Sequence, residues 1–401
     1  MRILVADAFE QSGIDGLEAA GCTVLFQPTL KDESLRDAIV QTQADVLVVR
    51  STAVTAPMLE AGALSLIVRA GAGYNTIDVA AASRRGIYVS NCPGKNAVAV
   101  AELTLGLMLA LDRRIPDNVA ALRAGTWNKK EFSNARGLFG STLGLLGYGH
   151  IAQEVAKRAL AFGMHVSVWS RRFANGVEQP DSPVRAAPSI EALAKTADIV
   201  SVHLALGKDT RGLLGGGFFN RMKPGAIFVN TARAEVVDYA ALEKAVTERG
   251  LRVGLDVFPS EPGTGSAEFS TPLAALPNVY GTHHIGGSTD QAQEAIAAET
   301  VRVITSYVTT GKVPNVVNLA RTTPATHMMI VRHHDRPGVL ASVFDALRSV
   351  GINVQETENI IFDGAEAAVA RINMDGCPSD DHVTALRDAN PDILDVRVVA
   401  L

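Results

Sequence analysis

Five side chains that suit acid–base chemistry stand in three short motifs in the second half of the sequence. They are Arg233 in NTARAEVVD, Asp256 and Glu261 in GLDVFPSEP, and His283 and His284 in GTHHIGGS. A histidine can take a hydroxyl proton near neutral pH, a carboxylate can hold its second ring nitrogen, and an arginine can grip a substrate carboxylate. The combination is typical of hydride transfer from a secondary alcohol. Taken singly, these residues also fit an ion pair of Arg233 with Glu235, a solvated loop and a satisfied core histidine.

A glycine motif lies between an apolar run and a predicted helix, in TLGLLGYGHIA at residues 142–152. Gly147 and Gly149 let the backbone approach a pyrophosphate, and the free N–H groups at the start of the helix favour its negative charge. A glycine motif alone also fits a tight structural turn. The strand–turn–helix context, with a second strand HVSVW soon after, favours a dinucleotide site.

The second strand of this unit ends in Trp169, Ser170, Arg171 and Arg172, where dinucleotide sites usually carry an acidic residue. A carboxylate there would hold the ribose 2′-hydroxyl of NAD, whereas serine and arginine tolerate the 2′-phosphate of NADP. The two arginines also fit solvated loop charges. We expect NAD as the cofactor and keep NADP as an alternative.

Two arginines end predicted strands in the first half of the chain, Arg50 after DVLVV and Arg69 after LIV. Open parallel sheets bind ligands at the carboxyl ends of their strands, so both cations would face one crevice and anchor an anionic substrate. Each arginine alone also fits a helix cap or a surface ion pair. Their shared position at strand ends favours the anion site.

The elements that must position these residues are short β-branched runs alternating with helical stretches. The first five runs read as strands buried on both faces, and a long Ala/Leu helix from Asn96 as N-cap to Arg114 separates them from a second series. The fold class is therefore α/β, with two doubly wound parallel-sheet domains, one flavodoxin-like and one Rossmann. A helix over 288–310, ended by Gly311, would cross back to the first domain. We expect residues 1–95 with 285–320 to bind substrate and residues 96–284 to bind the dinucleotide.

The last part of the chain begins a new pattern after the polar segment ARTTPAT, which reads as a linker. Residues 326–401 follow the order βαββαβ, which predicts a small ferredoxin-like domain.

The bulk composition excludes several classes of protein. A length of 401 residues calls for two or three domains, and a net charge of −5 argues against a nucleic-acid binder. The three cysteines lie far apart without CxxC spacing, so we expect neither a disulfide framework nor a metal site. The N-terminus reads as a buried strand and no apolar run is long enough for a membrane span, so we expect a cytoplasmic protein with no membrane partner.

These motifs together resemble the D-isomer-specific 2-hydroxyacid dehydrogenase family across nearly the whole chain. The matching segments are VRSTAVT, VRAGAGYNTID, NCPGKNAVAVAEL, LGLLGYGHIA, NTARAEVVD, GLDVFPSEP and HIGGST. They are most similar to those of the family's phosphoglycerate-oxidising members. The resemblance implies oxidation of 3-phospho-D-glycerate to 3-phosphohydroxypyruvate, the first step of serine biosynthesis.

The resemblance also assigns residues to roles. It makes Arg233, Glu261 and His284 catalytic. It assigns nucleotide contacts to Gly147, Gly149, His150, Ile151, Ser170, Arg171, Thr231, Ala232, Arg233, Asp256, His284, Gly286 and Gly287. It assigns substrate contacts to Arg50, Arg69, Ala72 and Gly73, and to Arg113 from a partner subunit. We therefore expect a homodimer or homotetramer.

Three positions depart from the family pattern. His283 stands where proline usually precedes the catalytic histidine, so the assignment to His284 rests on the following IGGS. Ala152 replaces the third glycine of the loop, where any small residue suffices. Ser170 replaces the usual aspartate, which puts strict NAD specificity in doubt.

The tail resembles an ACT domain, a regulatory module that binds amino acids, with RHHDRPGVL and GINV as its landmarks. In phosphoglycerate-oxidising enzymes that serine inhibits, the effector lies between the ACT domains of two subunits. The matching positions are His333, Asp335 and Asn353, with L-serine or another amino acid as the effector. A module that only dimerises is the alternative.

Two other functions fit parts of the sequence. A glyoxylate or hydroxypyruvate reductase that uses NADPH would suit Ser170, Arg171 and Arg172, while Arg50, Arg69 and the tail oppose it. A non-catalytic, nucleotide-sensing corepressor shares the fold and the catalytic residues. Such regulators typically carry disordered extensions, whereas this chain has an ordered tail.

Overall fold

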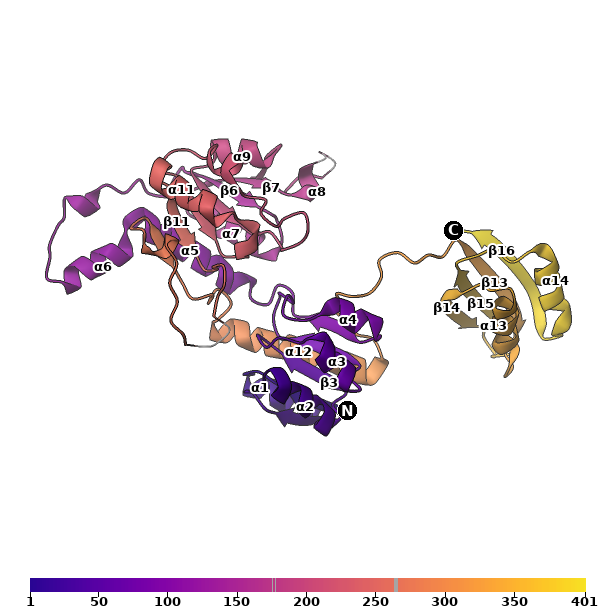
Figure 1. Ribbon diagram of the computed structural model, residues 1–401. Helices are drawn as coiled ribbons and strands as arrows, with labels where there is room; N and C mark the ends of the chain where they lie inside the picture. The colour runs from indigo at the N-terminus through magenta and orange to yellow at the C-terminus, as the bar shows by residue number, and fades with distance from the viewer. Residues whose placement is uncertain (175, 177, 263–265) are drawn as a thin grey trace. The chain divides into compact units, whose positions relative to one another are not determined.

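The computed structural model describes residues 1–174, 176, 178–262 and 266–401. These residues form two compact units, residues 1–318 and residues 319–401. The first unit contains two parallel sheets, and the second contains one antiparallel sheet (Figure 1). The α/β class with a Rossmann-like sheet is thereby confirmed.

The N-terminal sheet has five parallel strands in the order β2-β1-β3-β4-β5. The strands are β1 (Arg2–Val5), β2 (Thr23–Phe26), β3 (Val46–Val49), β4 (Leu66–Arg69) and β5 (Tyr88–Asn91). The helices between them are α1 (Gln11–Ala19), α2 (Asp32–Thr42), α3 (Ala56–Ala61) and α4 (Val79–Arg84). The expectation that all five strands are buried on both faces is wrong for β2. This strand lies at the edge of the sheet, and its residue Phe26 is 47% exposed.

The long helix α12 (Asp290–Thr310) packs beside α1, on the N-terminal sheet. Its N-cap Thr289 accepts a hydrogen bond from the Ala292 N–H, and Gly311 ends it in the left-handed conformation. Ser12 on α1 donates to Glu294 on α12 at 2.5 Å. A helix from the end of the first unit therefore covers the sheet that the beginning of the chain forms.

The second sheet has seven parallel strands in the order β12-β11-β10-β9-β6-β7-β8. The strands are β6 (Thr142–Leu146), β7 (His165–Trp169), β8 (Arg185–Ala186), β9 (Ile199–Val202), β10 (Ile227–Asn230), β11 (Arg252–Leu255) and β12 (Val279–Gly281). The helices are α5 (Ala97–Arg113), α7 (His150–Ala161), α8 (Arg171–Ala174), α9 (Ile190–Thr196), α10 (Gly216–Phe219) and α11 (Tyr239–Arg249). The strand order reverses direction between β6 and β9, which is where doubly wound sheets bind ligands.

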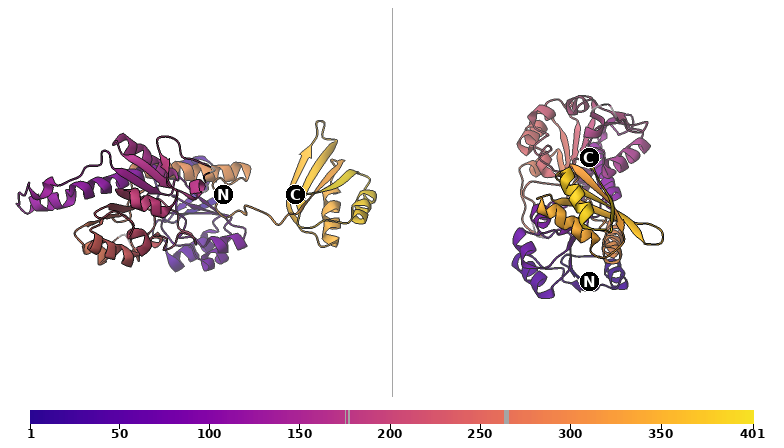
Figure 2. Two further views of the ribbon diagram at one scale, coloured as in Figure 1. Left: turned by 90° about the horizontal axis from the view of Figure 1, so that it is seen from above. Right: turned by 90° about the vertical axis from the view of Figure 1, so that its right-hand side faces the viewer.

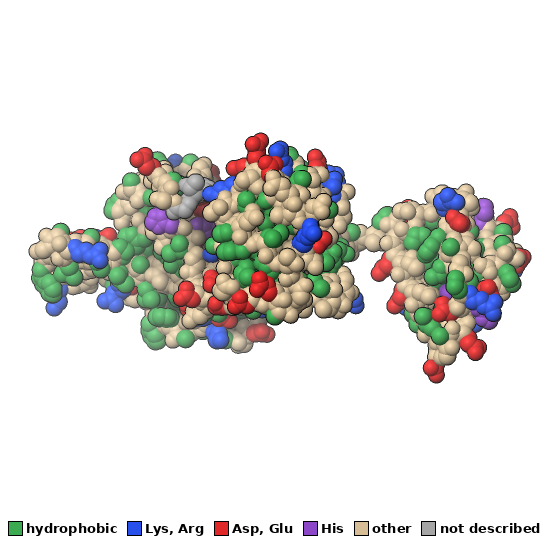
Figure 3. Space-filling model, turned by 90° about the horizontal axis from the view of Figure 1, so that it is seen from below, with side chains coloured by type: hydrophobic (Ala, Val, Ile, Leu, Met, Phe, Trp, Pro, Cys, Tyr) green, Lys and Arg blue, Asp and Glu red, His purple; other side chains and the backbone are tan. Residues whose placement is uncertain are grey.

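Helix α5 begins after Asn96 as expected, but the Asn96 side chain does not cap it. Its Oδ1 atom is instead buried without a hydrogen-bond partner among the described residues. After α5, helix α6 (Ile115–Arg123) projects from the unit as an arm (Figure 2). Hydrophobic side chains lie exposed on this arm, as Figure 3 shows on one face. They include Ile115, Val119 and Leu122 on α6 and Trp127 beyond it, which is 80% exposed.

The second unit follows the order β13, α13, β14, β15, α14, β16. Its elements are β13 (His327–His334), α13 (Val339–Ser349), β14 (Val354–Ile361), β15 (Ala367–Met374), α14 (Asp380–Ala389) and β16 (Ile393–Ala400). The sheet is antiparallel, in the order β14-β15-β13-β16, and buried residues of α13 and α14 pack on it. β14 forms one edge of the sheet and is mostly exposed.

No helix among the described residues is long and apolar enough to cross a membrane. Cys22, Cys92 and Cys377 are free thiols.

Candidate active site

The glycine loop follows β6 and leads directly into α7. Gly147 has a φ of +94°, and a Cβ on it would lie 2.5 Å from the carbonyl oxygen of His203, so only glycine fits. Gly149 precedes the helix, and His150 and Ile151 are its first residues. The N–H groups of a first turn have no partner within the helix. The loop therefore has the conformation and the free donors that a pyrophosphate requires.

The ribose position at the end of β7 lacks a carboxylate. Ser170 follows Trp169, and its hydroxyl accepts a hydrogen bond from the Arg172 N–H at 3.4 Å. Arg171 lies on the surface, 3.3 Å from Asp209, with both side chains exposed. The residues predicted to decide between NAD and NADP thus occupy the expected strand end, with no acidic side chain contributed by residues 169–172.

The predicted catalytic pair, His284 and Glu261, lies on two loops on the carboxyl side of the seven-stranded sheet. His284 Nδ1 lies 2.6 Å from Glu261 Oε2, and Glu261 Oε1 accepts a hydrogen bond from the Phe258 N–H at 2.7 Å. Burial raises the pKa of Glu261, but the hydrogen bonds from His284 and Phe258 outweigh it and hold this pKa below its usual value. An ionised Glu261 can therefore orient the His284 ring and leave Nε2 for substrate.

The backbone of His284 adopts a left-handed conformation, with φ of +54°. Asp256, at the end of β11, holds this turn: its carboxylate accepts from the Thr282 hydroxyl at 2.6 Å and from the N–H groups of Ile285 and Gly286 at 2.9 Å. Asp256 is only 1% exposed. Its predicted contact with the nucleotide stays a prediction, and the structure gives it the additional task of shaping the histidine turn.

Arg233 reaches from the seven-stranded sheet to the N-terminal sheet. Its guanidinium donates to Ala232 O at 2.7 Å, and a Cβ on Gly73 would lie 1.9 Å from its Nη2 atom. Burial lowers the pKa of Arg233, while the charges of Glu235 and Glu261 raise it. No ion pair joins Arg233 to Glu235 in the described part of the chain, so the positive charge of Arg233 is available to an anionic ligand although Nη1 donates to Ala232 O.

Arg69 brings a second guanidinium to the same region. It lies at the end of β4 against Gly71, where a Cβ would come within 1.6 Å of Arg69 Nη1. Burial, followed by the positive charges of Arg233 and Arg50, lowers the pKa of Arg69 to about 10. Its buried Nε has no hydrogen-bond partner among the described residues. The positive charges of Arg50, Arg69 and Arg233 therefore repel one another here, which is the electrostatic condition for binding an anion.

Asp7 was not predicted, although it shapes this anion site. Its carboxylate accepts from the N–H groups of Arg50, Ser51 and Thr52, at 2.6, 3.1 and 3.1 Å. These hydrogen bonds lower its pKa despite its burial. Asp7 follows β1, the strand beside β3, so its position at a strand end was the signal available in the sequence.

Three of the remaining predicted residues make contacts within the first unit, namely Thr231, Ala72 and Gly287. Thr231 is buried and its hydroxyl lies 2.9 Å from that of Thr104 on α5. Ala72 O accepts a hydrogen bond from Asn91 at 2.6 Å, which fixes the loop that carries Gly73. Gly287 packs against Asn96, where a Cβ would come within 3.1 Å of the Asn96 Nδ2 atom. Arg113 is exposed at the end of α5, at the base of the α6 arm, and its side chain makes no hydrogen bond or ion pair to another described residue.

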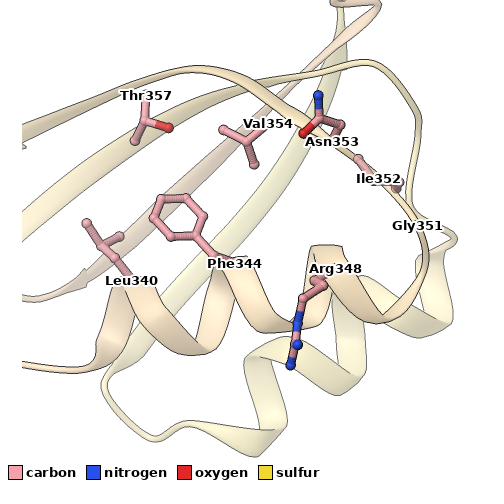
Figure 4. A pocket seen from close by; sticks show the side chains of 8 residues that line it. All are labelled: Leu340, Phe344, Arg348, Gly351, Ile352, Asn353, Val354 and Thr357. Carbon is pink, nitrogen blue, oxygen red and sulfur yellow. The ribbon is translucent and has the colours of Figure 1, made fainter. Parts of the chain in front are cut away.

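The three residues predicted for an effector do not meet within one copy of the second unit. Asp335 precedes α13 and Asn353 follows it, and a helix of this length spans about 16 Å. Asn353 lines a groove of about 770 Å³ with Leu340, Phe344 and Arg348 (Figure 4). His333 is 1% exposed, and its two ring nitrogens lie 2.8 Å from His334 O and 3.2 Å from Asn359 Oδ1. His333 therefore has both ring nitrogens engaged in this copy, and its contact with an effector stays a prediction.

Comparison with known proteins places the chain in a family. The model of the D-isomer specific 2-hydroxyacid dehydrogenase NAD-binding domain matches residues 105–286. The chain is 33% identical to the D-3-phosphoglycerate dehydrogenase of Escherichia coli over 369 residues, 88% of this chain and 87% of that protein. It is 43% identical to the hydroxypyruvate reductase of Thermotoga maritima over 277 residues, 68% of this chain and 87% of that protein.

A third relative is longer than this chain. The D-3-phosphoglycerate dehydrogenase of Methanocaldococcus jannaschii is 39% identical over 322 residues, which are 80% of this chain and 60% of that protein. Among solved structures, the NAD⁺-bound 3-phosphoglycerate dehydrogenase of Entamoeba histolytica matches with a TM-score of 0.66 and 27% identity, over 80% of this chain and 99% of that one. The chain therefore belongs to the D-isomer-specific 2-hydroxyacid dehydrogenase family of NAD-dependent oxidoreductases.

Proposed function

We propose that this protein oxidises 3-phospho-D-glycerate to 3-phosphohydroxypyruvate, the first step of serine biosynthesis. The observation that carries the reaction type is the 2.6 Å contact between His284 Nδ1 and Glu261 Oε2 beside the buried guanidinium of Arg233. The observation that favours a phosphorylated substrate is the unpartnered Nε of Arg69, near the charges of Arg50 and Arg233. The names of the Escherichia coli and Methanocaldococcus relatives agree with it.

The residues divide the chemistry between them. Arg233 binds the substrate carboxylate and stabilises charge on the forming carbonyl oxygen. His284 removes the hydroxyl proton through Nε2, and Glu261 stabilises the imidazolium that forms. Gly147, Gly149 and the start of α7 would hold the pyrophosphate of NAD, which when bound supplies the hydride acceptor. Arg69 and Arg50 would hold the phosphate.

An initial-rate matrix tests the assignment. NAD and NADP are each combined with 3-phospho-D-glycerate, D-glycerate and D-lactate, and kcat/KM is measured for every pair. The proposal expects the highest value for phosphoglycerate with NAD, and loss of turnover of every substrate in His284→Ala. Turnover of glycerate at or above that of phosphoglycerate would contradict it.

A glyoxylate or hydroxypyruvate reductase with NADPH is the second candidate. Ser170 at the end of β7 favours it, because a carboxylate at this position would repel a 2′-phosphate and a serine does not. The name of the Thermotoga relative also favours it. The same matrix, run in the direction of reduction with hydroxypyruvate, separates the two candidates. A corepressor without turnover is excluded if any 2-hydroxy acid is oxidised by the wild type and not by His284→Ala.

The second unit acts as an ACT domain that binds L-serine between two copies. The position of Asp335 and Asn353 at opposite ends of α13 supports a shared site, because one small ligand cannot reach both within one copy. Calorimetry with L-serine tests this function. Heat of binding and inhibition that are both lost in Asn353→Ala, and kept in the exposed α14 variant Asp381→Asn, support it. Absence of heat with the wild type would leave a module that only dimerises.

The protein assembles as a homodimer or homotetramer in the cytoplasm. The α6 arm supports the assembly, because it has no buried residue and exposes several large apolar side chains. Arg113 at its base would then enter a partner subunit's site. Sedimentation velocity of the full chain measures the oligomeric state directly.

A further inference from the structure

A single peptide group lies between the hydroxyl of Tyr239 and the carboxylate of Glu261. Tyr239 Oη donates to Val257 O at 2.6 Å, and the N–H of Phe258 donates to Glu261 Oε1 at 2.7 Å. The Val257 carbonyl and the Phe258 N–H belong to the same planar unit. The tyrosine and the carboxylate therefore hold opposite ends of one rigid group.

The surroundings fix Tyr239 firmly. It is the first residue of α11, whose N-cap Asp238 accepts a hydrogen bond from the Ala241 N–H at 3.1 Å. Its ring packs against the core of the seven-stranded sheet. Burial, together with the charges of Glu261 and Glu235, raises the pKa of Tyr239, so its hydroxyl keeps its proton and remains a donor. The Val257 side is equally constrained, because Val257 is buried.

The peptide group transmits this constraint to the catalytic pair. A carbonyl that accepts a hydrogen bond makes its own N–H a stronger donor, because linked hydrogen bonds polarise one another. The Phe258 N–H contributes to the lowered pKa of Glu261. Glu261 in turn lies 2.6 Å from His284 Nδ1, so its carboxylate can orient the imidazole ring. A connected line of contacts thus runs from Tyr239 through the 257–258 peptide group and Glu261 to His284.

We propose that Tyr239 is a positioning residue for this reaction, holding the 257–258 peptide group so that Glu261 faces His284 Nδ1. The inference rests on the proposed function of His284 and Glu261. Tyr239 does not touch the reacting atoms, so its loss should lower the rate of the chemical step more than it weakens binding. The effect should also depend on the presence of the Glu261 carboxylate.

A double-mutant cycle tests this dependence. Tyr239→Phe removes the hydroxyl and keeps the ring, and we expect it to lower kcat about tenfold with each KM within about twofold. In the Glu261→Gln background the same change should alter kcat by less than about twofold. Tyr307→Phe, on α12 against Tyr88, removes a phenol hydroxyl elsewhere and should leave kcat unchanged. An equal loss in both backgrounds, or none in the wild type, overturns the proposal.

A spectroscopic measurement separates this proposal from the proposed function. In protein labelled with ¹⁵N-histidine, the Nδ1 proton of His284 should be a downfield resonance that is protected from exchange by Glu261. Tyr239→Phe should shift this resonance and speed its exchange, whereas Tyr307→Phe should not. An unchanged resonance overturns the positioning role. A changed resonance in a protein without any dehydrogenase turnover would support the role and refute the function.

Discussion

The guanidinium of Arg233 occupies the space that a side chain at Gly73 would need, with only 1.9 Å between Nη2 and an added Cβ. The two residues come from different sheets of the first unit. Gly73 does not have a positive φ, so the reason for glycine here is the approach of the arginine and not the backbone. The loop after β4 and the loop after β10 are therefore fitted to each other at the site that we propose for the substrate carboxylate.

Gly73→Ala should reduce activity without unfolding the protein. The colliding atom is the far end of a flexible side chain, so Arg233 can move away at little cost in stability and lose its alignment. We expect kcat/KM to fall about 100-fold, as for a displaced transition-state donor. Thermal unfolding should change by no more than a few degrees. Gly106→Ala, inside α5 with no atom near the added Cβ, is the matched control and should keep full activity.

Arg50→Ala should discriminate between phosphorylated and unphosphorylated substrates. A charge-assisted hydrogen bond to phosphate contributes about 1.5–3 kcal/mol, so KM for phosphoglycerate should rise about tenfold or more. The kcat/KM for glycerate should stay within about twofold, because glycerate has no group for Arg50 to bind. Arg36→Ala, on the exposed face of α2, should affect neither substrate. Equal effects on both substrates would place the phosphate elsewhere.

Ser170→Asp should increase the preference for NAD over NADP. A carboxylate at the end of β7 can accept from the ribose 2′-hydroxyl and repels a 2′-phosphate. We expect the ratio of kcat/KM for NAD to that for NADP to rise at least about tenfold, which corresponds to about 1.4 kcal/mol. The exposed Arg171, already paired with Asp209, should contribute less to this ratio when changed to Ala. If Arg171→Ala alters the ratio more than Ser170→Asp, the arginine governs specificity.

The strands and the catalytic motifs could be predicted because both depend on local patterns. Buried parallel strands are continuous apolar runs, and the predicted site residues follow such strands within a few positions, as Arg233 follows β10 and Asp256 follows β11. The roles of Asp7 and Tyr239 could not be predicted in the same way. Each acts on backbone groups of a loop 18 or more residues away, at 43 to 45 positions for Asp7 and 18 for Tyr239. Such contacts exist only once the strands are assembled.

The exposed edge of β2 and the burial of His333 could not be predicted, for related reasons. A run such as TVLF does not reveal whether a strand lies in the middle of a sheet or at its edge, since that depends on the crossover order. His333 was predicted as a ligand from its place in a motif, but its burial depends on how β13 lies between β15 and β16. Both properties follow from topology.

Glu299 should make stability depend on acidic pH. Hydrogen bonds from Arg302, Asn315 and Lys95 lower the pKa of Glu299 from 4.5 to about 2, although its burial alone would raise this pKa. A carboxylate with a lowered folded-state pKa stabilises the protein above its unfolded pKa and loses this contribution as the pH falls toward the folded value. The gap in unfolding midpoint between wild type and Glu299→Gln should therefore be largest above about pH 5 and narrow toward pH 3. Glu248→Gln, at an exposed pair with Lys244, should show no such narrowing.

Leu122→Glu on the α6 arm should weaken self-association. The Leu122 side chain is 57% exposed in the single chain. It belongs to the apolar surface of α6, a helix that has no buried residue. Burying a new carboxylate at an interface is costly, so the dissociation constant measured by sedimentation equilibrium should rise about 100-fold or more. Val40→Glu places the same charge on an exposed apolar position of α2 and should leave the constant unchanged.

Dissociation should lower the activity per subunit only if Arg113 completes a partner's site. In that case Arg113→Ala should cause the same loss of activity without dissociation. A variant that stays associated would show that the arm is not the interface.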